Sequence, residues 1–243
     1  MKGLKNITHI LIISLVFTLS SYAQSWVGAW QSTSENHDDS LHTIVLIVTE
    51  HYLVSTTYHK NSGAFIKTKG GAWKQNANET INLTLEFDNE NPDTVGTQED
   101  LNIMVNKETL TLLDDNIKFE RLDDGDPGIL NGAWLMSARM KDGTLQQRNT
   151  NKPRKTMKIL SGSRFQWIAY NTETKTYMAT GGGTYTTKDG RYTETLDFFS
   201  KDPSKVGLQL EFNYQLIDGN WQHTGKSSKG DPIHEVWSLR KSL

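Results

Sequence analysis

Gly-Ala-Trp occupies residues 28–30 and again residues 132–134, and each tripeptide begins a stretch of chain that is similar to the other. Each copy is roughly a hundred residues long, which is the size of an ordinary domain. The repeat therefore predicts two consecutive domains of the same fold. Beyond the tripeptides, the matched positions are Ile47-Val48 with Ile159-Leu160, Tyr58 with Tyr170, residues 69–73 with 181–185, residues 81–87 with 192–198, and Val95-Gly96 with Val206-Gly207.

The two copies join at residues 123–128, a run of Asp, Gly and Pro residues that favour turns. This junction is the natural boundary between the two domains. We therefore assign residues 24–125 to the first domain and residues 126–243 to the second.

Residues 1–23 have the pattern of a secretory leader. Lys2 and Lys5 precede a short apolar run, and Ala23 provides the small residue expected at the cleavage site. We expect an exported protein, periplasmic or secreted, that begins at Gln24. No later segment is long and apolar enough to cross a bilayer, and the mean hydropathy of −0.57 is that of a chain without a membrane span. The chain has no Cys, which excludes disulfides, thiolate catalysis and cysteine-based zinc sites.

Both copies carry the period-two pattern of half-buried strands. Apolar residues alternate with polar ones over residues 208–216 and over residues 81–87. Tight turns such as Lys188-Asp189-Gly190 and Asp218-Gly219-Asn220 separate the short strands. Many short antiparallel strands in sequence order favour a closed sheet, because closure removes exposed edges. The pattern predicts an all-β chain made of two consecutive up-and-down antiparallel β-barrels.

The repeated tripeptides, together with an Arg near the end of each copy, resemble the structural signature of lipocalins and their calycin relatives. The second copy is also similar to a lipocalin-like domain of exported bacterial proteins, notably over residues 158–185, 192–200 and 231–240. The resemblance implies that the Trp packs over the barrel floor and that the Arg lies across its ring as a plug. These plug residues are Gly28, Trp30 and Arg121 in the first copy, and Gly132, Trp134 and Arg240 in the second.

The two halves carry opposite charge. Residues 24–129 hold 18 acidic and 7 basic side chains, a net charge of −11, whereas residues 130–243 hold 10 acidic and 17 basic side chains, a net charge of +7. One interpretation is that the halves attract each other and pack together; another is that the basic half receives a small anionic molecule. The basic residues are scattered and the chain carries an export leader, so nucleic acid is not an expected partner.

The second copy places polar side chains among apolar ones. Along residues 192–198 the alternation directs Tyr192, Glu194, Leu196 and Phe198 to the inside of the barrel. A buried carboxylate needs a partner, a proton or water, so this strand indicates a site. Taken with the matching faces of neighbouring strands, the candidate ligand-binding residues are Trp167, Tyr192, Glu194, Trp221, His223, Glu235 and Trp237.

The first copy provides an internal control for this set. By the repeat alignment, Leu83 stands at the position of Glu194, Leu110 at that of Trp221 and Leu112 at that of His223. We therefore expect a filled first barrel and a candidate site in the second.

Three hypotheses follow for the function. The main one is a non-catalytic binding or accessory protein that holds a small molecule in the second barrel. A second is a small hydrolase or isomerase that uses Glu194, His223 and Glu235 as acid and base. A third is a protein-interaction module with the acidic first barrel as its docking face, in which a His–Glu pair only organises the core. A single His with two Glu is a weak ligand set for a metal, and no glycine-rich nucleotide motif is present, so we assign no metal and no cofactor.

Overall fold

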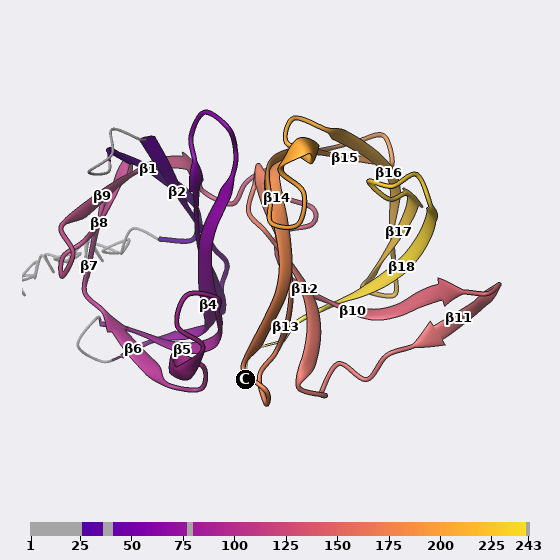
Figure 1. Ribbon diagram of the computed structural model, residues 1–243, viewed down its shortest axis with the longest axis horizontal. Helices are drawn as coiled ribbons and strands as arrows, with labels where there is room; N and C mark the ends of the chain where they lie inside the picture. The colour runs from indigo at the N-terminus through magenta and orange to yellow at the C-terminus, as the bar shows by residue number, and fades with distance from the viewer. Residues whose placement is uncertain (1–25, 36–40, 77–79, 242–243) are drawn as a thin grey trace, which may run out of the picture.

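The computed structural model describes residues 26–35, 41–76 and 80–241, and it is built almost entirely from antiparallel β-strands (Figure 1). The leader predicted at residues 1–23 lies outside the described residues. Two curved sheets lie side by side, as Figure 1 shows, and each wraps around its own interior. The prediction of an all-β chain with two consecutive antiparallel barrels is confirmed.

The first barrel has nine strands in the order β6-β5-β4-β3-β2-β1-β9-β8-β7. β6 pairs with β5 and β7 pairs with β8, and the single residue Asn102 separates β6 from β7. The chain itself therefore closes this barrel as it runs from one edge of the sheet to the other. The strands are β1 (Gly28–Glu35), β2 (Leu41–Val48), β3 (Tyr52–His59), β4 (Phe65–Gln75), β5 (Ile81–Asp88), β6 (Gln98–Leu101), β7 (Ile103–Val105), β8 (Thr109–Leu112) and β9 (Ile117–Asp123).

The second barrel closes by a direct pairing of its first and last strands, β10 and β18. Eight strands form the closed wall, and β11 extends β10 into a hairpin that projects away from the first barrel (Figure 1). The strands are β10 (Gly132–Lys141), β11 (Thr144–Gln147), β12 (Arg154–Leu160), β13 (Arg164–Asn171), β14 (Thr176–Lys188), β15 (Arg191–Phe199), β16 (Gln209–Ile217), β17 (Asn220–Lys226) and β18 (Pro232–Leu239).

Helical turns among the described residues are confined to one short 3-10 turn in each barrel. These are η1 (Pro92–Thr94) after β5 and η2 (Pro203–Lys205) after β15, so they occupy the same place in the two copies. No helix in the described part of the chain is long and apolar enough to cross a membrane.

The register of the strands reproduces the sequence repeat. Trp30 on β1 stands opposite Leu46 on β2, and Trp134 on β10 stands opposite Lys158 on β12. The two sheets also share a β-bulge at the same place, between Gly70 and Gly71 in the first copy and between Gly182 and Gly183 in the second. The repeat in sequence is therefore a repeat in structure, down to an irregularity of the sheet.

The bulges decide which side chains leave the barrels. A bulge inserts one extra residue, so the alternation of inward and outward positions shifts beyond it. Phe87 on β5 and Phe198 on β15 thus lie outside their barrels, in a cluster between them. The expectation that Phe198 points inward was wrong for this reason. Gly71 and Gly183 are needed at the bulges, because a Cβ would clash with the carbonyl oxygens of Thr84 and Thr195.

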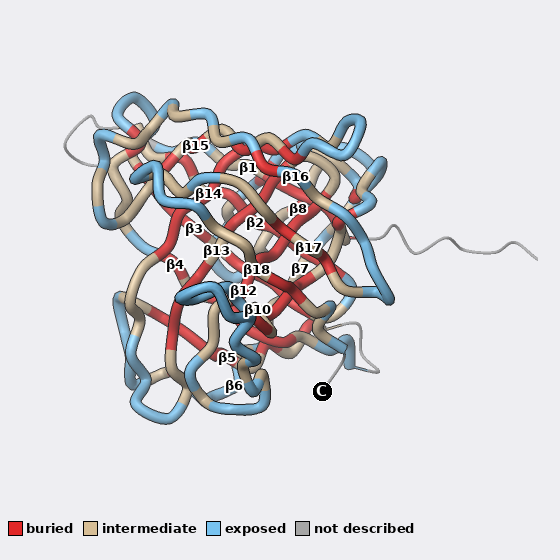
Figure 2. Tube along the Cα trace, turned by 90° about the vertical axis from the view of Figure 1, so that its right-hand side faces the viewer, coloured by how far each residue is buried: buried red, intermediate tan, exposed pale blue. Residues whose placement is uncertain are grey.

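Three apolar clusters hold the molecule together. One fills the first barrel around Trp30, another fills much of the second around Trp221, and the third lies between the barrels around Tyr170. Seen from the side of the second barrel, buried residues follow the strands and exposed residues collect in the turns (Figure 2). The third cluster joins the two barrels through a shared apolar core.

The two barrels face each other through equivalent surfaces. Phe87 of the first stacks near Tyr170 of the second at 4.9 Å between ring centroids, and Phe198 of the second lies 5.2 Å from Tyr58 of the first. Tyr58 and Tyr170 are matched positions of the repeat, as are Phe87 and Phe198. The contact is thus made twice, once in each direction, as at an interface with twofold symmetry.

A buried polar network lies at the centre of this interface. The amide of Gln166 accepts a hydrogen bond from Thr56 at 2.7 Å and donates to Thr68 and Thr180 at 3.1 and 2.9 Å. Buried polar groups that are fully paired fix one arrangement of the packed surfaces. This network therefore sets the register of one barrel against the other.

Candidate functional site

A cavity of about 290 Å³ lies inside the second barrel. It arises where inward-facing positions of seven strands and the turn after β17 meet. The wall carries four titratable side chains, Lys158, Glu194, His223 and Glu235. The remaining lining residues are Met136, Thr156, Trp167, Leu196, Phe199, Leu210, Phe212, Ser227, Ser228, Ile233 and Trp237.

Lys158 and Glu194 form a buried ion pair in the wall of this cavity. Lys158 on β12 and Glu194 on β15 point inward because each lies in phase with apolar residues of its strand. The Lys158 Nζ lies 2.6 Å from Glu194 Oε1, and the side chains are only 5 % and 4 % exposed. The pair satisfies the need of the buried Glu194 carboxylate for a partner.

Aromatic rings surround the ammonium group of Lys158. Five ring centroids lie 5.0 to 5.9 Å from its Nζ, and ring faces at this distance attract a cation. Burial and the adjacent Glu194 carboxylate raise the pKa of one of these rings, Tyr192, well above its usual range. The charge of Lys158 is therefore balanced by Glu194 and the ring faces. The five rings belong to Phe165, Tyr192, Phe212, Trp221 and Trp237.

His223 and Glu235 form the second polar pair. The His223 Nδ1 lies 3.2 Å from Glu235 Oε2, and the indole N–H of Trp237 donates to the same oxygen at 3.2 Å. Burial, and then the charge of Lys158, hold the pKa of His223 below its usual value against the pull of Glu235. Burial alone would raise the pKa of Glu235, but the hydrogen bond and charge of His223 outweigh it and the pKa is lowered. At neutral pH the pair is an uncharged imidazole beside a carboxylate.

The second ring nitrogen of His223 is a buried atom without a partner. Because a carboxylate only accepts hydrogen bonds, the proton of the neutral ring lies on Nδ1, toward Glu235. The Nε2 of the ring is then an acceptor, and no hydrogen-bond partner for it exists in the described part of the chain. The His223 ring thus carries an unpaired acceptor that the protein itself encloses.

The low pKa of His223 predicts acid sensitivity of the fold. In the unfolded chain this imidazole takes up a proton near pH 6.5, whereas in the folded barrel it does so only at lower pH. The unfolded state then binds more protons, so stability falls as pH falls below about 6.5, by at most about 1.4 kcal/mol per pH unit for this group. Melting temperatures between pH 7 and pH 5 should decline less steeply for His223→Leu than for the parent. An equal slope would contradict the assignment, and His234→Leu, outside the cavity, is the control.

The structure brings the seven predicted site residues together, and five of them line the cavity. The other two, Tyr192 and Trp221, are fully buried and pack against His223 at 5.7 and 5.2 Å between ring centroids. Glu194 does not pair with His223, as a single His–Glu network would require. Its partner is Lys158, and the partner of His223 is Glu235. That these residues bind a ligand stays a prediction.

Sequence reasoning missed Lys158. It lies in the basic segment 154–158, where a Lys is ordinarily taken for a solvent-facing residue. The signal that could have found it is the repeat: if Ile47 corresponds to Ile159, then Lys158 corresponds to the buried Leu46. A charged residue in one copy at a position that is part of the core in the other copy is the signal.

The strand registers extend this comparison to all four polar residues. Glu194 matches Leu83, since Glu194 stands opposite the second residue of β16 and Leu83 stands opposite the second residue of β6, its counterpart. The pair His223 and Glu235 on β17 and β18 matches Leu112 and Ile117 on β8 and β9. The first barrel therefore holds four aliphatic side chains where the second holds Lys158, Glu194, His223 and Glu235.

The plug predicted at the barrel floor is present in the first barrel. The Arg121 guanidinium lies 3.8 Å from the ring centroid of Trp30, which is completely buried. The indole N–H of Trp30 donates to the carbonyl of Trp26 at 2.8 Å, and that of Trp134 donates to Leu130 at the same distance. The two tryptophans are anchored alike.

The plug predicted for the second barrel was wrong in its cation. Arg121 stands opposite Trp30 in the register, but the residue opposite Trp134 is Leu239. Arg240 comes one position later, and a shift of one residue turns a side chain to the other face of a sheet. Its guanidinium therefore points between the barrels, 4.2 Å from the ring centroid of Tyr52.

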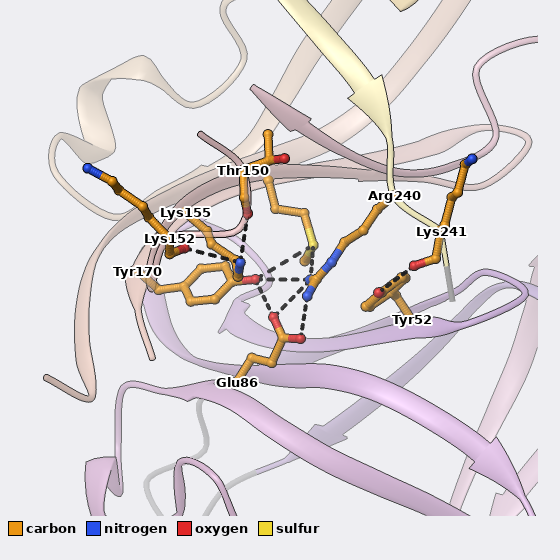
Figure 3. A network of polar contacts seen from close by, with 9 residues as sticks. Tyr52, Glu86, Thr150, Lys152, Lys155, Tyr170, Arg240 and Lys241 are labelled. Atoms are coloured by element: carbon orange, nitrogen blue, oxygen red, sulfur yellow. Dashed lines mark hydrogen bonds and ion pairs between the residues drawn. The ribbon is translucent and has the colours of Figure 1, made fainter. Parts of the chain in front are cut away.

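Arg240 is held there by a carboxylate of the first barrel (Figure 3). Its two terminal nitrogens donate to the two oxygens of Glu86 at 2.8 and 2.6 Å, and the Tyr170 hydroxyl donates to the same carboxylate at 2.5 Å. Figure 3 shows Lys155 beside this group, bound to backbone carbonyls rather than to Glu86. The bidentate ion pair therefore joins the end of the second barrel to β5 of the first.

A second cavity, of about 230 Å³, lies between the barrels next to this network. Two of its polar side chains are already engaged: Arg240 by Glu86, and the Tyr52 hydroxyl by the carbonyl of Lys241 at 3.0 Å. In the described ranges no three His, Asp or Glu side chains gather closely enough to hold a metal ion. The cavity of the second barrel is therefore the candidate site.

Comparison with known proteins covers the second barrel. A family model described as a domain of unknown function (DUF4488) matches residues 129–241. No curated protein matches the chain. The matched residues include every strand of the second barrel and all four polar residues of its cavity. The barrel that carries the candidate site is therefore the part of this chain that is similar to the DUF4488 domain.

Proposed function

We propose that the protein is an exported binding protein that holds a small molecule in the cavity of its second barrel. One observation carries the proposal. Four titratable residues line a cavity in one barrel, and the other barrel of the same chain replaces all of them by aliphatic residues. The leader pattern at residues 1–23 supports export.

The fold itself does not require these polar groups. A buried ion pair contributes little net stability, because the cost of removing two charges from water offsets their attraction. The first barrel closes with Leu46 and Leu83 at the positions of Lys158 and Glu194, which shows that an apolar pair serves the architecture. A polar set retained at such a cost is typical of a site.

The arrangement of the charges favours binding over catalysis. The acid–base hypothesis needs Glu194, His223 and Glu235 to act on one substrate as a set. Glu194 is instead engaged by Lys158 at 2.6 Å, which leaves His223 and Glu235 as a separate pair. The interaction-module hypothesis is less well supported, since one face of the acidic first barrel is already covered by the second.

The cavity suits a compact ligand. A volume of about 290 Å³ lies at the lower end of small-molecule sites, whose walls are mostly apolar with a few polar groups. Glu235 is 20 % exposed, whereas Lys158, Glu194 and His223 are at most 5 % exposed. Solvent therefore reaches the cavity at Glu235, and the ion pair lies at its inner end.

The test is to isolate the protein from the envelope or medium of its native cells and to measure its mass by native mass spectrometry, which preserves bound ligands. We expect a chain that begins at Gln24 and carries an additional small-molecule mass. The variant Lys158→Leu/Glu194→Leu, which copies Leu46 and Leu83, should fold but lose that mass. The variant Lys67→Leu/Glu90→Leu, an exposed pair of the first barrel, is the control and should keep it. A parent protein that never carries a ligand would overturn the proposal.

A further inference from the structure

The charge inside the cavity is opposite to that of the half that contains it. Residues 130–243 have a net charge of +7, but Lys158 is the one Lys or Arg among the residues that line the cavity. Glu194 neutralises it, and the carboxylate of Glu235 remains beside an uncharged imidazole. The four titratable groups thus leave the cavity with a net charge of −1.

Lys158 does not provide an anchor for an anion. Its side chain is 5 % exposed, and its ammonium lies 2.6 Å from Glu194 and is surrounded by five aromatic rings. An anionic ligand would have to displace Glu194 or lie next to it in a poorly solvated space, where like charges repel strongly. The basic residues of this half lie elsewhere on the barrel and do not offset that repulsion.

One carboxylate oxygen on the cavity wall has no hydrogen-bond partner within the described part of the protein. His223 and Trp237 donate to the same oxygen of Glu235, Oε2, which leaves Oε1 for a ligand. Oε1 belongs to a carboxylate that is 20 % exposed and lines the cavity, so it suits a ligand that donates hydrogen bonds. A group that donates hydrogen bonds and carries positive charge fits this carboxylate best.

We propose that the ligand is a small molecule with a protonated amine on an apolar, ring-bearing body. This inference rests on the proposed binding function. The ammonium group donates to Glu235 Oε1, and the body packs against Trp167, Phe199 and Trp237, which line the same cavity. The ring faces add attraction for the cation.

Three probes of nearly equal size and different charge test this class on the full-length protein: phenethylamine, phenethyl alcohol and hydrocinnamate. Isothermal titration calorimetry at neutral pH measures each affinity. We expect phenethylamine to bind at least about tenfold more tightly than the neutral alcohol, and the anion hydrocinnamate to bind least, because the cavity carries a net negative charge. This comparison uses the unaltered protein and does not depend on the folding of a variant.

Two variants locate the effect. Glu235→Gln keeps the shape of the side chain and removes its charge, and should reduce the affinity for phenethylamine by roughly tenfold or more with little change for the alcohol. Glu211→Gln makes the same charge change on the exposed outer side of β16 and should leave both affinities unchanged.

The outcomes separate this inference from the function on which it rests. Equal affinities for the three probes, or preference for hydrocinnamate, would overturn the amine class and leave a small-molecule site in place. Failure of all three to bind would overturn the amine class as well. If the protein isolated from its native cells also carries no additional ligand mass, the proposed binding function is overturned as well.

Discussion

The free energy of unfolding of the Glu194→Leu variant is expected to fall by about 3–5 kcal/mol, the cost of leaving one charge of a buried pair uncompensated. The change leaves the Lys158 ammonium in an interior where both side chains are at most 5 % exposed. Lys158→Leu should cost a similar amount, because it leaves the Glu194 carboxylate without its cation. Urea unfolding followed by tryptophan fluorescence measures both variants.

The double variant Lys158→Leu/Glu194→Leu should recover most of the loss. An apolar pair of similar shape replaces a buried ion pair at little net cost, and the first barrel uses Leu46 and Leu83 at these positions. The exposed pair Lys67 and Glu90, at 2.9 Å in the first barrel, is the control. Its single variants should each cost about 1 kcal/mol or less. Single cavity variants as mild as these controls would mean that Lys158 and Glu194 are not buried as a pair.

This cycle also separates stability from binding. If the pair existed only to hold the barrel together, the double leucine variant would be as functional as the parent. If it exists for a ligand, the double variant is stable and empty. The comparison is informative because the first barrel is folded and has Leu46 and Leu83 at the positions of Lys158 and Glu194.

The fold could be predicted from the sequence because two signals agree. The doubled Gly-Ala-Trp shows that one domain occurs twice, and the alternation over residues 81–87 and 208–216 shows that the domain is built of strands. Neither signal depends on tertiary contacts, since both arise from the period of the strand and the length of the repeat. Closure of each sheet then follows from the need to remove free edges.

The positions beyond the bulges could not be predicted in this way. Alternation alone places Phe198 inside the barrel, but one extra residue at the bulge directs it to the partner barrel, next to Tyr58. The bulge depends on Gly182 and Gly183, and a glycine run in a strand is compatible with several bends. The same limitation hid the interface, because its aromatic residues read as parts of two separate cores.

Only some of the titratable residues of the candidate site could be predicted from the sequence. Glu194, His223 and Glu235 stand out because they interrupt apolar faces, whereas Lys158 lies among other basic residues and does not. The net charge of the second half does not describe the cavity either. That half has a surplus of basic residues, but the side chains that line the cavity include two carboxylates, Glu194 and Glu235, and one ammonium, Lys158.

The symmetry of the interface explains how one barrel can have an aliphatic interior while the other has titratable residues in its interior. Equivalent faces meet twice, through Phe87 with Tyr170 and through Phe198 with Tyr58. Each barrel thus supports the other as identical subunits do, while the two interiors are sealed from that surface by their own walls. Residues inside one barrel can change without altering the contact. The polar set of the second barrel and the aliphatic set of the first are such a difference between the two interiors.

Trp134→Ala and Arg240→Ala should each destabilise the protein, and their effects should add. Deleting the large buried indole is expected to cost about 3–5 kcal/mol. Removing Arg240 leaves the buried Glu86 carboxylate between the barrels without its ion-pair partner, which is also expected to cost about 3–5 kcal/mol. The two side chains project to opposite faces of the sheet, so the double variant should match the sum within about 0.5 kcal/mol.

The first barrel supplies the matched cycle in which addition should fail. Arg121 lies 3.8 Å from the Trp30 ring, so Trp30→Ala removes the contact that Arg121→Ala would remove again. The double variant should therefore cost less than the sum, by about 1 kcal/mol for a cation–π contact. Coupling in the Trp134–Arg240 cycle as large as in the Trp30–Arg121 cycle would place Arg240 on the floor of the second barrel. Additive effects in the second barrel, with coupling in the first, would instead confirm that the two arginines differ in role. Arg121 then packs on the Trp of its own barrel, whereas Arg240, one position later in the register, joins the two barrels.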